Sequence, residues 1–232
     1  MPQVGRRIGC GLAALAVVAV AKAPDAFAQA PRTHHGLYVR LAGGASYFTD
    51  AVTSDPTALL GVVNGTLKGG AISTEFAIGG SVSPGFVVGG ALFFNHLPAP
   101  SSTNAESSTV GTLPEFDFDP TTLTVIGPFA DWYFDPTSTS GGWHAQASVG
   151  YGILSFGQGN PRSGGFLTVP DQKGGGLATV LGGGYEWWVS GSWGIGVLGQ
   201  LIVGWGSGED TSNRTWKHRV LVPGLLFSAT MN

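Results

Sequence analysis

YEWWVSGSWGIG, which runs from Tyr185 to Gly196, places three tryptophans and a tyrosine around a short polar turn, with the acid Glu186 among them. A soluble core can use such a cluster, and so can a membrane–water interface, where amphipathic rings prefer to lie. Aromatic residues gather at two more short turns, because Phe86 follows the turn at 82–85 and aromatic residues flank the turn at 135–142 on both sides. A soluble core explains one such turn, whereas an interface explains all three.

We therefore predict an aromatic girdle at the end of the molecule where these short turns lie. Its predicted members are Phe86, Trp132, Tyr133, Phe134, Trp143, Tyr185, Trp187 and Trp193.

Alternation of apolar and polar residues with a period of two recurs after residue 35, which is typical of half-buried strands. The predicted strands lie near 36–50, 70–83, 86–97, 121–134, 143–157, 175–189, 192–206 and 215–230. Short turns alternate with longer polar connections, as in membrane barrels with an even number of strands. The sequence thus predicts an all-β fold, an eight-stranded antiparallel up-and-down transmembrane β-barrel.

The alternation also predicts which side chains face the barrel interior, because a charge on the lipid face costs several kcal/mol, about 2–4 at the midplane. Arg40, Glu75 and Glu186 fall on the polar faces of their strands, and Asp131 is expected there too. Unpaired charges in a narrow lumen are costly. We therefore predict a lumen charge network of Arg40 with one or more of Glu75, Asp131 and Glu186. The facing of 121–134, which contains Pro128, and of 215–230 stays open.

The first thirty residues resemble a secretory signal peptide. Arg6 and Arg7 precede an apolar run at 8–20, and small residues suit cleavage after Ala28 or Ala30. The run is too short for a spanning helix. The predicted domains are therefore a signal peptide at 1–30 with a signal helix, and a barrel at 31–232.

Charge and composition exclude other classes of protein. Removing residues 1–30 takes away three bases and one acid, which leaves 8 bases and 13 acids, a net charge of −5. Nucleic-acid binding, which depends on a basic surface, is therefore not expected. The GxGxxG at 194–199 lies inside a strand and does not open a helix, so it predicts no dinucleotide site.

No catalytic residues are predicted. His144 and Ser148 share a strand face but lie about 13 Å apart along the strand, too far for a hydrogen bond. Three loop acids, Glu115, Asp117 and Asp119, are a candidate cation site, because carboxylates at this spacing suit Ca²⁺. The alternative is an acidic, solvated strand extension, which we favour. We predict no cofactor and no other metal site.

Three segments resemble small outer-membrane β-barrel proteins of Gram-negative bacteria, the OmpA/OmpX-type group. GLYVRLAGG at 36–44 resembles their first strand, GYEWWVS at 184–190 their penultimate hairpin, and GLLFSA at 224–229 their assembly signal. The chain departs from the group at its end, Thr230-Met231-Asn232, where an aromatic residue is usual. The resemblance implies insertion by the barrel assembly machinery, location in the outer membrane with periplasmic termini, and contact with membrane lipid and lipopolysaccharide.

These observations predict a non-enzymatic membrane protein with a closed, charged lumen. Its role would be structural or surface interaction, with an unidentified partner contacting the long loops. Two alternatives stay open: a narrow channel or carrier for small, including hydrophobic, solutes, and a soluble lipocalin-like binder, which also has eight strands. The outer faces of the predicted strands are apolar, whereas a soluble lipocalin-like binder needs polar outer faces, so the lipocalin-like alternative is disfavoured.

Overall fold

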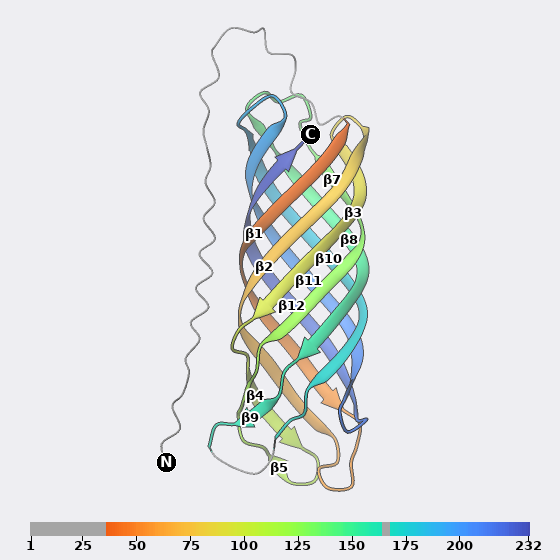
Figure 1. The fold of residues 1–232 in the computed structure, drawn as a ribbon, viewed down its shortest axis with the longest axis vertical. Coiled ribbons are helices and arrows are strands. Elements are labelled where there is room, and N and C mark those ends of the chain that lie inside the picture. The colour runs from red at the N-terminus through yellow and green to blue at the C-terminus, as the bar shows by residue number, and fades with distance from the viewer. Residues whose placement is uncertain (1–35, 164–167) are drawn as a thin grey trace, which may run out of the picture.

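The computed structural model describes residues 36–163 and 168–232, which form a closed ring of long antiparallel strands (Figure 1). The ring consists of β1 (Leu37–Ser54), β2 (Val63–Ser83), β3 (Phe86–Leu97), β7 (Thr121–Tyr133), β8 (Gly141–Phe156), β10 (Gln172–Trp188), β11 (Trp193–Asp210) and β12 (Thr215–Met231). Each strand pairs with the next along the ring, and β1 pairs with both β2 and β12, which closes it. The predicted eight-stranded antiparallel barrel is therefore confirmed. The predicted signal peptide and its helix lie outside the described residues.

Several ring strands are longer than the alternation predicted. β1 continues to Ser54, β2 begins at Val63, and β11 continues to Asp210, so the connections that the predicted strand ranges leave at 51–69 and 207–214 are partly paired strand. Their Ser, Thr, Gly and Lys residues resemble loop composition. They are strands nonetheless, because pairing with a long neighbour satisfies the backbone N–H and C=O groups.

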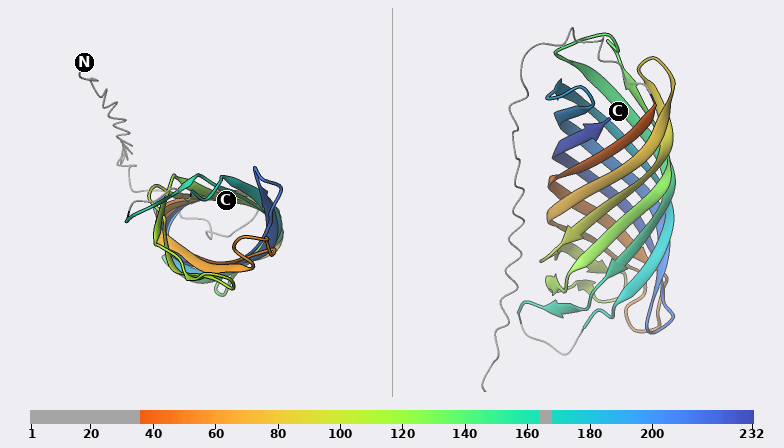
Figure 2. Two further views of the ribbon diagram at one scale, coloured as in Figure 1. Left: turned by 90° about the horizontal axis from the view of Figure 1, so that it is seen from below. Right: turned by 45° about the horizontal axis from the view of Figure 1, so that its top comes forward.

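The two ends of the barrel differ, as Figures 1 and 2 show. The three short turns, the start of β1 and the C-terminus lie at one end, which we call the turn end. The opposite end, which we call the loop end, carries four short strands that the sequence analysis missed. They are β4 (Ser101–Ser107), β5 (Gly111–Thr112), β6 (Phe116–Phe118) and β9 (Gly159–Pro161). β4 pairs with β2, and β6 joins β4 to β9, so one wall continues beyond the ring.

Burial is inverted relative to a soluble protein. Large apolar side chains such as Leu41, Phe76 and Phe227 are exposed on the outer surface, whereas Arg40, Glu75 and Asp131 are buried inside the ring. Among the described residues there is no helix with the length and apolarity needed to cross a membrane.

The structure shows which residues of β7 and β12 face inward, which the sequence analysis left open. In β7, Val125, Phe129 and Asp131 are buried, while Pro128 lies on the outer face. Proline has no N–H, and the pairing of β7 with β8 is interrupted at this point, where the Ser148 hydroxyl donates to the Pro128 carbonyl at 2.8 Å. In β12 the even-numbered residues face inward.

Apolar side chains fill much of the rest of the interior. One cluster extends from Tyr38 and Tyr133 near the turn end to Leu67, Leu97 and Phe156 near the loop end. The interior is therefore packed with side chains over much of its length, as expected for a ring of eight strands.

Candidate functional site: the buried charge network

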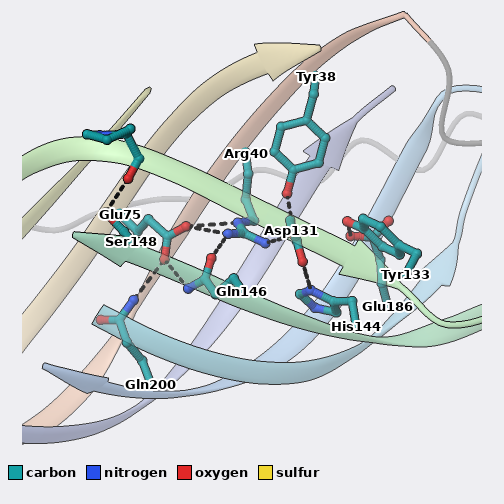
Figure 3. A network of polar contacts seen from close by, with 11 residues as sticks. Tyr38, Arg40, Glu75, Asp131, Tyr133, His144, Gln146, Ser148, Glu186 and Gln200 are labelled. Carbon is teal, nitrogen blue, oxygen red and sulfur yellow. Dashed lines mark hydrogen bonds and ion pairs between the residues drawn. The ribbon is translucent and has the colours of Figure 1, made fainter. Parts of the chain in front are cut away.

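Arg40 lies at the centre of the buried polar site. It follows Tyr38 by two residues on β1, so both side chains point into the ring, and the arginine is fully buried. Its guanidinium donates to Glu75 Oε1 from Nε at 2.9 Å and from Nη2 at 2.6 Å. Nη1 donates to Asp131 Oδ2 at 2.6 Å, and Nη2 also donates to Gln146 Oε1. One cation thus bridges acids on two separate strands, β2 and β7 (Figure 3).

The two acids have further donors. Asp131 Oδ2 accepts from the Tyr38 hydroxyl at 3.0 Å, and its Oδ1 lies 2.9 Å from His144 Nδ1. Glu75 Oε2 accepts from Gln146 Nε2 at 3.1 Å and from Gln200 Nε2 at 2.8 Å. Buried charges are tolerated when they are paired and their remaining positions are hydrogen-bonded, and these carboxylates meet that condition.

The network therefore joins β1, β2, β7, β8 and β11 across the lumen. Sequence reasoning placed Arg40, Glu75 and Asp131 together, and the structure brings them together. Gln146, His144 and Gln200 also belong to the network, and the sequence analysis did not assign them to it. Polar residues at alternating positions were the available signal for these three.

Glu186 does not reach Arg40. Its Oε2 accepts a hydrogen bond from the Tyr133 hydroxyl at 3.1 Å, and the Tyr133 ring stacks on His144 with centroids 5.0 Å apart. Glu186 thus forms a second polar contact nearer the turn end, linked to the main network through Tyr133 and His144 (Figure 3).

One predicted girdle member is wrong. Tyr133 is 1% exposed and points into the lumen, because its neighbours Trp132 and Phe134 occupy the outer face and alternation turns the residue between them inward. The seven other members are exposed or half-buried on the outer side: Phe86, Trp132, Phe134, Trp143, Tyr185, Trp187 and Trp193. Trp143 and Tyr185 meet edge to face at 5.3 Å.

The loop acids lie beside an arginine that the sequence analysis did not connect with them. Arg162, just after β9, donates from Nη1 to Glu115 Oε2 at 2.6 Å and from Nε to Asp117 Oδ1 at 2.7 Å. The Asp117 carboxylate raises the pKa of Arg162 above its usual value. Asp119 is exposed on the same stretch. The described residues contain no group of three or more acidic, His or Cys side chains arranged to hold a metal.

A buried contact between an acid and a histidine, away from Arg40, was also missed. Asp50 Oδ2 lies 2.7 Å from His218 Nδ1, and the His218 ring stacks on Phe156 with centroids 5.2 Å apart. Asp50 was the last residue of a predicted strand, and the facing of the strand that contains His218 had not been predicted. The two side chains meet because β1 pairs with β12 where the ring closes.

Comparison with known proteins gives a likeness in structure alone. No family model matches the chain, and no curated protein matches its sequence. The outer membrane protein OprG from Pseudomonas aeruginosa is 11% identical, with 87% of this chain and 99% of that chain covered and a TM-score of 0.51. Ail, the attachment invasion locus protein of Yersinia pestis, is also 11% identical, with 83% of this chain and 99% of that chain covered and a TM-score of 0.32.

The likeness to OprG spans nearly all of both chains, and it agrees with the closed ring, the inverted burial and the short turns at one end. The chain therefore has the fold of a small eight-stranded outer-membrane β-barrel protein.

Proposed function

We propose that this chain is a non-enzymatic integral protein of the outer membrane whose barrel is closed to solutes and whose loop end acts at the cell surface. In this proposal a signal peptide exports the chain, the barrel assembly machinery inserts it, and both termini lie in the periplasm. The barrel stabilises the membrane or presents the loops to a partner.

The buried network is the observation that carries the proposal. Arg40, Glu75 and Asp131 are each at most 2% exposed, and their hydrogen bonds cross the lumen. Phe93, the β3 residue opposite Glu75, and Val125 are buried among the same inward side chains. Ions or solutes would have to displace packed side chains and break a paired charge cluster to pass this point.

The outer surface supports insertion in a membrane rather than the lipocalin-like alternative. Leu225 and Phe227 on β12 are 57% and 70% exposed, and exposed apolar side chains recur on every strand of the ring. Apolar patches larger than a few hundred Å² are rare on soluble monomers. An apolar band with aromatic residues near the short turns suits lipid.

The histidine and serine positions support a role without catalysis. His144 Nδ1 is within hydrogen-bond distance of the Asp131 carboxylate, but the Ser148 hydroxyl donates to the backbone carbonyl of Pro128 and not to His144. A nucleophilic serine would instead need to donate to its general base.

The test is single-channel recording with the refolded chain inserted in a planar lipid bilayer. A heat-shifted band on a gel first establishes that each preparation is folded. We expect no steady conductance from the wild-type chain, because the network and its apolar surroundings leave no continuous aqueous path. Arg219→Ala changes a residue on the exposed face of β12, serves as the control and should also show no steady conductance.

Steady conductance from the folded wild-type chain that increases further in Arg40→Ala would overturn the closed-barrel proposal. The narrow channel would then be the better description, with Arg40 limiting its width.

A further inference from the structure

A separate cavity lies inside the loop end of the barrel, and we call it the loop-end pocket. Its volume is about 110 Å³. Its apolar wall includes Leu67, Ala105, Leu113, Phe116, Phe156 and Trp216. These residues come from the long ring strands, from β4 and β6 and, for Leu113, from the link between β5 and β6, so the pocket exists only where these segments extend the barrel wall.

The pocket reaches the protein surface on one side and adjoins packed side chains on another. Its lining residues Asn64 and Thr168 are exposed. Phe156, also in the lining, stacks on His218 of the buried Asp50–His218 pair. A molecule can therefore enter from the loop end, and the pocket adjoins a filled part of the lumen.

The two charged groups in the wall, Asp210 and Arg214, already have partners. Asp210 accepts from the Trp216 indole N–H at 3.1 Å and from the backbone N–H groups of Ser212 and Arg214 at 2.8 and 3.0 Å. The Arg214 guanidinium donates to Ser54 Oγ and to the carbonyl oxygens of Asp55 and Gly61.

The Ser102 hydroxyl, also in the wall, accepts from the Phe116 N–H at 2.8 Å. In the described part of the chain, none of the buried side-chain polar atoms that lack a partner belongs to a residue in this wall. A polar guest would lose its hydrogen bonds to water and find few replacements in a wall that is mostly apolar, which penalises it. The wall therefore selects for apolar guests.

The volume of the pocket limits the size of the molecule that it can bind. An apolar cavity of about 150 Å³ is known to hold one benzene molecule. The loop-end pocket is somewhat smaller but open at one side, so its enclosed part holds about one ring. Phe116, Phe156 and Trp216 supply aromatic surface, against which an aromatic ring packs well.

We propose that the loop-end pocket binds one small, neutral, apolar molecule of about the size of a single aromatic ring. This inference goes beyond the proposed function and does not depend on it, because a barrel that conducts nothing can still bind a guest at its mouth.

Fluorobenzene is the probe that tests this inference. Its ¹⁹F NMR signal is recorded with the full refolded chain in lipid nanodiscs and, as the reference for partition into lipid, with empty nanodiscs. We expect a saturable shift and broadening only with the protein. Ala105→Phe, which places a ring in the pocket, should weaken binding about tenfold or more. Ala51→Phe makes the same substitution at an exposed position of β1 outside the pocket and should bind as the wild type does.

Leu113→Trp is a second filling variant, used if Ala105→Phe shows no heat-shifted band. 4-Fluorophenol tests the polarity of the wall, and we expect it to bind about tenfold more weakly, because its hydroxyl group loses hydrogen bonds to water in a mostly apolar pocket. The inference is overturned if the folded wild-type chain gives no signal beyond empty nanodiscs, if a folded filling variant binds fluorobenzene as the wild type does, or if 4-fluorophenol binds equally well.

Discussion

At the scale of single residues, Arg40 has the most consequential environment in the molecule. It is the one cation among the described residues that is fully buried, and it neutralises acids from two strands. Removing one member of such a cluster leaves an uncompensated buried charge, which costs far more than the intact cluster contributes. Substitution of Arg40 therefore tests how much the buried charge network contributes to the stability of the barrel.

Arg40→Met should lower the free energy of unfolding by about 3–5 kcal/mol, because the Glu75 and Asp131 carboxylates lose their counter-ion. Urea titration of the barrel folded in lipid vesicles, followed by tryptophan fluorescence, measures this change. Arg219→Met removes the same side chain at an exposed position and should change stability by less than about 0.5 kcal/mol. Equal stability of the two variants would contradict the structural role of the network.

At the scale of elements, two adjacent glycines of β3 show how the strands approach one another. A Cβ atom at Gly89 would lie 2.1 Å from the carbonyl oxygen of Ile78 on β2, whereas a Cβ at Gly90 would meet nothing within 4 Å. Gly89 lies opposite Gly79 on β2, and both sit at a point where the two backbones come too close for a side chain. Gly90 faces outward.

Gly89→Ala should therefore destabilise the barrel by about 1–3 kcal/mol, since β2 or β3 has to shift. Gly90→Ala adds a methyl group on the open outer face and should leave stability equal or slightly higher. The midpoints of urea unfolding for the two variants, measured side by side, check this. The expectation fails if the two midpoints move together.

At the scale of the whole molecule, the outer apolar face decides whether the barrel lies in a membrane. Leu225 is 57% exposed and lies six residues before the end of β12. Six residues of tilted strand correspond to about 15 Å of depth, which is near the middle of an apolar band about 25 Å tall.

Leu225→Arg should cost about 2–4 kcal/mol of stability in lipid vesicles, because the charge enters the hydrocarbon region. Leu59→Arg is the matched control, because Leu59 is 70% exposed but lies in the loop between β1 and β2. We expect this second change to have little effect. If Leu225→Arg is as well tolerated as Leu59→Arg in urea titrations, the band is not in contact with lipid.

Much of this fold could be predicted from local sequence alone. A strand places successive side chains on opposite faces, so the period-2 pattern determined that Arg40 and Glu75 point inward and that Leu41 and Phe76 point outward. The spacing of short turns determined the number of ring strands. Both features depend only on neighbouring residues, and a sequence records these directly.

Only the tertiary structure decided which inward groups meet. The register places Gly182 opposite Gln146 and Gln200, and Glu186 lies four residues further along β10, so Glu186 contacts Tyr133 instead of Arg40. The loop-end pocket and the short strands beside it likewise need segments far apart in the chain. Register, stagger and ring closure depend on all the strands at once, and for this reason alternation within one strand could not determine them.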